Sequence, residues 1–245
     1  MENSKLHSIQ IDGLGTYGGG EFDKVSIAGS GKFTESVKSE KFQVSGIGTL
    51  LGELETKKLG VSGTCKVEGN VLAENIDVSG VLKCEGNVEV SEELRVNGMT
   101  KIEQCLKANR VKGKGFLEVK EDIAGEMIEI EGVLNCGKFL NCEVLVFTAV
   151  GTSVLNEVGA ARVRIRQGYE SVTKFLGPFM PKILKENKVV ASTIEGDEII
   201  LENCEAKVVR GKNIKIGKGC RIGVVEYSDQ IDVDPEAIVD TVNQI

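Results

Sequence analysis

The chain has 245 residues and a formal net charge of −7, and it contains 30 glycines, three prolines and no tryptophan. This length is enough for one long repeat array or for two small domains. The acidic balance argues against a generic nucleic-acid surface, which is basic, and no apolar run approaches the roughly 20 residues of a membrane span.

Residues 1–8 form a short polar N-terminal tail that lacks the apolar stretch of a secretory signal. It contains His7, the single histidine of the chain, which we expect to be solvated. The seven cysteines include no Cys-x-x-Cys pair, so the sequence favours reduced, buried thiols over disulfides or zinc ligands. Reduced cysteines and the missing signal together predict a cytoplasmic protein.

A column of glycines dominates the sequence after this tail. Its members follow one another at intervals of about 17 residues: Gly13, Gly29, Gly46, Gly63, Gly80, Gly98, Gly115 and Gly132. A fixed short period is the signature of a solenoid, in which each repeat contacts mainly its neighbours.

Apolar residues flank each of these glycines at every second position, and lysine, glutamate, serine and asparagine stand between them. In one repeat the apolar positions are Phe42, Val44 and Leu50, and in the next they are Leu59, Val61 and Val67. A period of two indicates strands, and one repeat cannot bury its own apolar face. We therefore expect an all-β, single-stranded parallel β-helix of about 12 rungs, with its main array over residues 9–167.

The register breaks over residues 168–188, where the glycine column is missing. Apolar residues recur there at helical spacing, but Pro178 and Pro181 interrupt any helix. We expect a short helical or loop insertion packed on the coil. A partner-docking or membrane-touching element is the alternative, because large apolar residues are densest here.

The strand pattern resumes after the insertion. Paired apolar positions at Ile199 and Leu201, and again at Ile231 and Val233, predict C-terminal β-helix rungs over residues 189–233. Residues 234–245 open with Asp-Pro and hold few apolar residues, so we expect a loosely ordered tail.

The sequence carries no strong catalytic signature. A hexapeptide-repeat acyltransferase is the sharpest enzyme alternative, because Ile216–Gly223 matches two hexads. Its six-residue period conflicts with a 17-residue repeat, and those enzymes commonly use a histidine base. The Gly-rich stretch at Gly29–Lys32 lacks the first glycine and the Ser/Thr of a phosphate-binding loop. We therefore predict no enzyme activity, no catalytic residue, no cofactor and no metal ligand.

The repeats resemble those of a known family. The segments VSIAGSGKF, FQVSGIGTL, LGVSGTCKVEGNV and IDVSGVLKCEGNV are similar to rungs of bactofilins, bacterial polymer-forming cytoskeletal proteins. The stretch Ser192–Tyr227 resembles the longer members, and the likeness covers about residues 9–230.

This resemblance implies a right-handed β-helix that assembles end to end, without nucleotide, into non-polar filaments. It also implies a cytoplasmic scaffold, often at the inner face of the cell membrane, that positions other proteins in cell shape, division or motility. The expected partners are further copies of the chain and unidentified proteins, with peripheral membrane association and no nucleic acid. The alternative function is a non-polymerising β-helical module that binds a protein partner.

The two ends of such a coil are the expected self-association sites, because each exposes unpaired backbone groups over an apolar layer. The candidate residues at the N-terminal end are Ile9, Ile11, Tyr17 and Phe22, and those at the C-terminal end are Ile231 and Val233, with Ile238 as a further candidate. Contacts between like ends would give non-polar filaments, and head-to-tail contacts would give polar ones.

Overall fold

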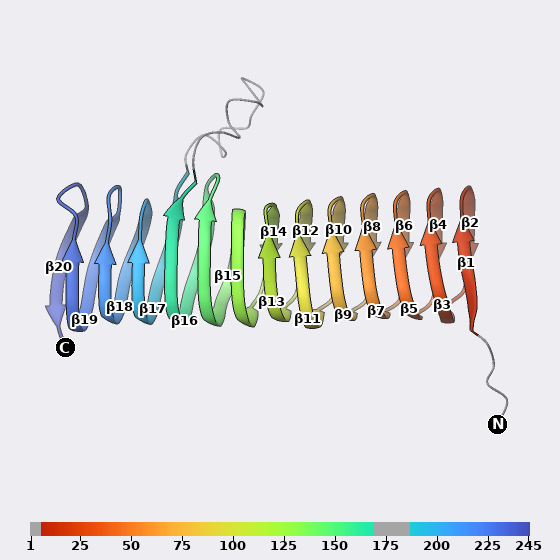
Figure 1. Ribbon diagram of the computed structural model, residues 1–245, viewed down its shortest axis with the longest axis horizontal. Coiled ribbons are helices and arrows are strands. Elements are labelled where there is room, and N and C mark those ends of the chain that lie inside the picture. Colours follow the sequence, from red (N-terminus) through yellow and green to blue (C-terminus); the bar gives the residue numbers. More distant parts are fainter. Residues whose placement is uncertain (1–5, 169–186) are drawn as a thin grey trace, which may run out of the picture. The chain divides into compact units, whose positions relative to one another are not determined.

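The computed structural model describes residues 6–168 and 187–245 and confirms the predicted fold class. In these residues, parallel strands form an all-β solenoid of about 13 turns, roughly 17 residues apart. The chain divides into two compact units, Met1–Lys112 (unit 1) and Gly113–Ile245 (unit 2). Each unit is a stack of parallel strands (Figure 1).

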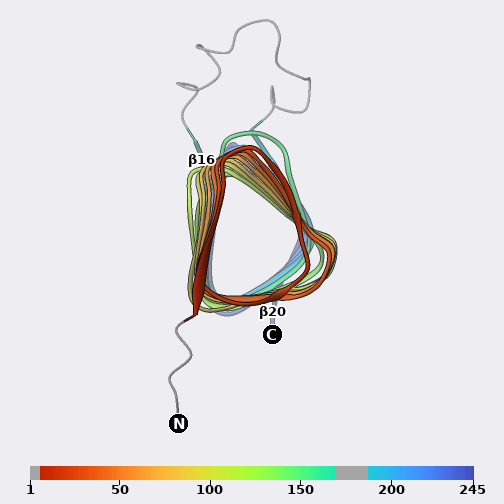
Figure 2. The ribbon, with the colours of Figure 1, turned by 90° about the vertical axis from the view of Figure 1, so that its right-hand side faces the viewer.

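Unit 1 alternates longer strands, which bend at a corner of the turn, with strands of four residues. The longer strands are β1 (His7–Ile11), β3 (Gly20–Ile27), β5 (Val37–Val44), β7 (Leu54–Val61), β9 (Val71–Val78), β11 (Val88–Val96) and β13 (Leu106–Gly113). The short strands are β2 (Leu14–Tyr17), β4 (Ser30–Phe33), β6 (Ile47–Leu50), β8 (Thr64–Val67), β10 (Val81–Cys84) and β12 (Met99–Ile102). Each turn therefore has three sides (Figure 2).

The strands of unit 1 pair in parallel, and each residue pairs with the residue one turn later in the chain. Phe42 lies beside Leu59 in the next turn, and Val44 lies beside Val61. A register shift between Val90 and Glu93 adds one residue to β11, which accounts for the single 18-residue glycine interval.

Viewed from the N-terminal end, the turns of unit 1 run clockwise as they recede, so its coil is right-handed (Figures 1 and 2).

Unit 2 contains fewer, longer strands, because several continue through the corners of the turn. They are β14 (Phe116–Val119), β15 (Ile123–Ala149), β16 (Ser153–Gln167), β17 (Val189–Leu201), β18 (Cys204–Ile216), β19 (Arg221–Val233) and β20 (Ile238–Gln244). Val163 pairs with Ile199 across the insertion, and Ile199 pairs with Ile214 only 15 residues later. The array therefore continues past residue 188 with turns of unequal length.

Two sequence expectations for this region have different outcomes. The predicted helix or loop over 168–188 lies almost wholly outside the described residues, which stop at Gly168 and resume at Asn187. The expectation of a loose tail over 234–245 is wrong, because β20 pairs in parallel with β19. The Asp-Pro turn is closed by a hydrogen bond from Ala237 N to Asp234 O at 2.9 Å, and backbone pairing then orders a segment poor in apolar side chains.

The glycine column allows the turns of unit 1 to approach one another at a corner. A Cβ added at Gly46 would lie 2.0 Å from the carbonyl oxygen of Gly29 and 2.3 Å from that of Ala28. The same closeness recurs at Gly63 and Gly80. Glycine is needed here because any side chain would collide with the backbone of the preceding turn.

Candidate functional site

The first turn of unit 1 leaves one backbone edge open. Among the described residues, β1 pairs with β3 and β2 pairs with β4, and no strand pairs with their other edges. Unpaired strand edges present rows of N–H and C=O groups that favour pairing with another strand. The N-terminal end of unit 1 is therefore a template for addition of a further turn.

Large apolar and aromatic side chains accompany this open edge. Leu14, in β2, is 90% exposed, and Tyr17 is 36% exposed. The Tyr17 ring stacks on Phe33 of the next turn at 5.6 Å between centroids, and Phe33 contacts Phe42 edge to face at 5.9 Å. The aromatic column thus holds Tyr17 in place while Leu14 projects into solvent.

The last turn of unit 2 also has an open edge in the described residues. β20 pairs with Arg221–Tyr227 of β19, and the end of β19 pairs with β18 alone. Ile238 and Val242 are each 47% exposed, and Ile245 is 68% exposed. This edge therefore also combines unpaired backbone groups with aliphatic side chains in contact with water.

The six residues named from the sequence fall into two groups in the structure. Ile11 is buried in the core, with 3% exposure, and Ile9, Phe22 and Ile231 are half-buried. Tyr17 and Val233 have the larger exposures, 36% and 38%.

Sequence reasoning missed Leu14, Val242 and Ile245. Leu14 follows Gly13 directly, at a position that holds Ser30 in the next turn, so an apolar residue at an outward repeat position was the available signal. The two C-terminal residues were missed because β20 was not recognised as a strand.

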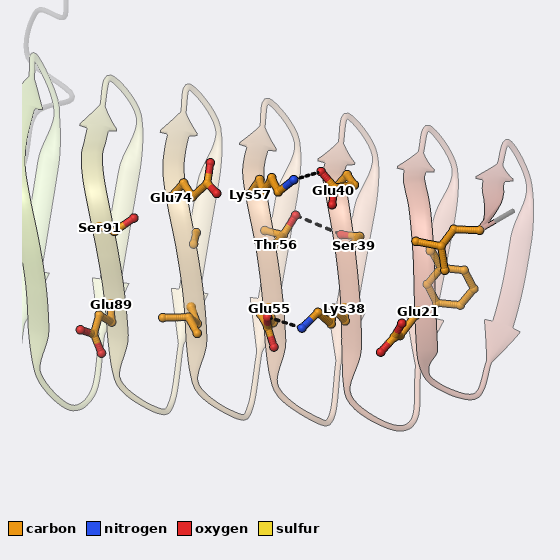
Figure 3. Close-up of a pocket in the computed structure, with 14 residues that line it drawn as sticks. Glu21, Lys38, Ser39, Glu40, Glu55, Thr56, Lys57, Glu74, Glu89 and Ser91 are labelled. Carbon is orange, nitrogen blue, oxygen red and sulfur yellow. Dashed lines mark hydrogen bonds and ion pairs between the residues drawn. The ribbon is translucent and has the colours of Figure 1, made fainter. Parts of the chain in front are cut away.

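A separate shallow groove lies on one side of unit 1, where β5, β7, β9 and β11 run next to one another (Figure 3). Lys38 pairs with Glu55 at 2.6 Å, and Lys57 pairs with Glu40. Between these ion pairs, the Ser39 hydroxyl donates to the Thr56 hydroxyl at 3.0 Å. The charged walls of this groove are thus largely neutralised by contacts from one turn to the next.

The pKa values of the groove lysines and of two buried cysteines favour a structural role over acid–base chemistry. Hydrogen bonding and charge attraction from Glu55 raise the pKa of Lys38, and Glu40 does the same for Lys57. Burial raises the pKa of the Cys65 and Cys142 thiols to about 12. A lysine held as ammonium and a thiol held protonated are both weak nucleophiles.

Within residues 6–168 and 187–245, no group of three or more His, Cys, Asp or Glu side chains is placed to hold a metal ion.

A search of the same residues for a helix long and apolar enough to cross a bilayer finds none.

Two proteins of Bacillus subtilis (strain 168) are similar to part of the chain. The uncharacterized protein YhbF is 33% identical over 106 residues, which cover 43% of this chain and 39% of that protein. The uncharacterized protein YhbE is 32% identical over 115 residues, which cover 46% of this chain and 43% of that protein. The chain thus spans about two fifths of the length of these relatives. No family model and no solved structure matches the chain.

Proposed function

We propose that the protein is a structural scaffold that assembles end to end through the open turns of its solenoid. The observation that carries this proposal is the combination, at both terminal turns, of an unpaired strand edge with exposed aliphatic side chains such as Leu14 and Ile238. The resemblance of the repeats to bactofilins supports the same function.

End contacts would relieve two unfavourable features at once. Pairing the edge of β2 with a strand of another copy would satisfy backbone groups that now face water. Covering Leu14 would remove part of its side chain from solvent, since Ile47, at the same outward position two turns later, stays 56% exposed between its neighbouring turns. Full burial of a leucine side chain contributes about 1.5–3 kcal/mol, so Leu14 would contribute a fraction of that. Neither gain requires a nucleotide, so we propose nucleotide-independent assembly.

The assembled form would present the sides of the solenoid as repeated surfaces for other proteins. We propose that these sides recruit or position partners in cell shape, division or motility, in the cytoplasm and at the inner face of the membrane. The groove between β5 and β11 is one such surface. It would also be the binding surface of a non-polymerising module, if the ends do not associate.

Two charge substitutions at the ends test the proposal. Leu14→Asp and Ile238→Asp place a carboxylate at the first and last turn, and Ile47→Asp is the matched control, because Ile47 is 56% exposed on a short strand within unit 1. Electron microscopy should show long assemblies for the parent chain and the control, and none for the end variants. Thermal unfolding must show that all variants are folded. Folded end variants that assemble like the parent chain would refute the proposal.

Mixing the two end variants then determines the polarity. If like ends meet, each variant alone forms dimers through its unaltered end. If unlike ends meet, each variant alone is monomeric, and the mixture forms a heterodimer of one Leu14→Asp and one Ile238→Asp chain. Sedimentation velocity distinguishes these patterns, and monomers in all three samples would contradict association through either end.

A further inference from the structure

One side of unit 2 carries rows of outward side chains whose charges alternate from turn to turn. The arginine row is Arg162, Arg164 and Arg166, on β16, and all three side chains are exposed. Val163 and Ile165 between them are buried in the core. Alternate residues of a strand stand about 6.6 Å apart, so the three guanidinium groups form a line along β16.

The arginine row has no intramolecular partner in the described residues. No carboxylate there lies within ion-pair distance of Arg162, Arg164 or Arg166, although ion pairs from one turn to the next are common elsewhere in the solenoid. Three parallel cations without a partner repel one another. This surface therefore gains from contact with an anionic group of another molecule.

The rows beside the arginine row define the pattern of charged and apolar groups that the other molecule must carry. One turn earlier, Val144 and Val146 pair with Arg162 and Arg164 and form a half-buried apolar row. One further turn back, 17 residues before Val146, stands Glu129, which is exposed between the buried Ile128 and Ile130. With Glu131 it forms the acidic row.

The turn after the arginine row is acidic as well. Glu198 pairs in register with Arg162, Ile200 pairs with Arg164, and Glu202 follows Leu201. Two turns before the apolar row, Lys114 lies 2.8 Å from Glu131. The rows therefore read positive, negative, apolar, positive and negative along unit 2. A uniform polyanion fits this face poorly, because acidic residues stand on the strand next to the arginine row, only about 4.8 Å away.

This alternating order of charged and apolar rows is complementary to the same rows on a second copy of the chain. A two-fold axis parallel to the strands and passing through the apolar row reverses the order of the turns. It places the arginine row of one copy opposite the acidic row of the other, and the apolar row opposite itself. Sheets stacked face to face lie about 10 Å apart, which an arginine and a glutamate side chain span together. Arg164 then meets Glu129, and Arg166 meets Glu131.

We propose that this face of unit 2 is a lateral interface with a second copy of the chain, with Val146 of both copies at the two-fold axis. The pairing is side to side, so it is independent of the proposed end contacts. Five rows about 4.8 Å apart and about 20 Å wide cover roughly 500 Å² per copy. That is at the low end for specific interfaces, so the lateral dimer should dissociate on dilution and in salt.

Disulfide trapping at the axis tests the interface directly. The full chain with Val146→Cys should form a disulfide-linked dimer under mild oxidation, because residue 146 meets its own copy there. Val154→Cys is the matched control, since Val154 is 53% exposed on β16, the strand that pairs with β15, but on another side of the turn. End-to-end contacts do not bring two copies of residue 146 together, so a failure of the proposed function would not produce this result.

Charge reversal then tests the register. In the Val146→Cys chain, Arg164→Glu should lower the dimer yield by at least about ten-fold, because two like-charge pairs replace two ion pairs. Adding Glu129→Arg should restore the yield. Three outcomes would overturn the proposal: equal trapping of residues 146 and 154, trapping unaffected by Arg164→Glu, or no rescue by the second reversal. Heparin binding lost in Arg164→Glu without any trapping would assign the face to a polyanion.

Discussion

The side-chain oxygen Oδ1 of Asn70 accepts a hydrogen bond from the backbone N–H of Asn87, one turn further along the solenoid, at 2.9 Å. Asn87 Oδ1 in turn accepts from the N–H of Cys105 at 3.1 Å, and Asn70 Nδ2 donates to Glu53 at 2.9 Å. Side chains at this corner thus satisfy backbone groups that the strand ladders leave unpaired. In unit 2, Asn135 does the same for the N–H of Val154 at 2.9 Å.

Replacing Asn87 by alanine should destabilise the protein, because the N–H of Cys105 loses its acceptor. We expect the free energy of unfolding to fall by about 1 kcal/mol, the usual contribution of such a bond. Urea unfolding followed by circular dichroism measures the change. Asn75→Ala is the control, since Asn75 bonds only the exposed Glu92 side chain, and its effect should be below about 0.5 kcal/mol.

Gly46→Ala should destabilise unit 1 by about 1–3 kcal/mol, the usual cost of forcing extra atoms into a packed site. The added Cβ would meet two backbone oxygens of the preceding turn, at 2.0 and 2.3 Å, and backbone cannot move aside as a flexible side chain would. Gly13→Ala is the matched control, because nothing lies within 4 Å of a Cβ there. Equal midpoints of urea unfolding for the two variants would show that the glycine column does not set the spacing of the turns.

Thr100→Val should stabilise the protein. The Thr100 side chain has no exposure to solvent, and its hydroxyl oxygen has no hydrogen-bond partner. Valine has nearly the same shape and removes a buried polar group that costs about 1–3 kcal/mol when it is unpaired. The opposite result is expected for Thr56→Val, which leaves the Ser39 hydroxyl without its acceptor. A loss of stability in Thr100→Val, measured by urea unfolding, would contradict this account of the site.

The buried cysteines predict a loss of stability at alkaline pH. Burial raises the pKa of Cys65 to about 12 and that of Cys84 to about 11, from 9.0 in the unfolded chain. The folded state therefore binds more protons above pH 9, so stability should fall as the pH rises from about 9 towards 12. Unfolding midpoints over this range measure the effect, and the quadruple variant with alanine at Cys65, Cys84, Cys142 and Cys204 should lose part of the slope.

The same burial predicts selective alkylation. Six cysteines are buried and Cys105 is half-buried. At pH 8, iodoacetamide should therefore modify Cys105 first in the folded protein, whereas all seven should react in urea. Peptide mass spectrometry identifies the modified residues. Rapid labelling of Cys65 in the folded state would show that the core of unit 1 is open to solvent.

The regular part of the fold could be predicted from the sequence because two constraints act on every turn. The corner at Gly46 and Gly63 admits no side chain, and the positions of Phe42 and Val44 must be apolar to be buried. The prediction of strands failed where one of these two constraints is absent. β20 is held by backbone pairing to β19, and its largely exposed side chains carry no pattern that marks a strand.

The candidate sites were harder to predict than the fold. Alternation placed Ile11 and Tyr17 at the first turn, but it did not show that Ile11 belongs to the core while Leu14 projects into solvent. The arginine row can be recognised in the sequence as three arginines at alternate positions, Arg162, Arg164 and Arg166. Its relation to Glu129 depends on the register between turns, which only the stacked structure provides.

Electron microscopy of the purified chain over a range of concentrations, without nucleotide, tests the central claim most directly. Assembly through open solenoid ends predicts elongated particles that lengthen as the protein concentration rises and that persist when nucleotide and divalent cations are removed. Folded particles of one uniform size, independent of concentration and salt, would contradict it.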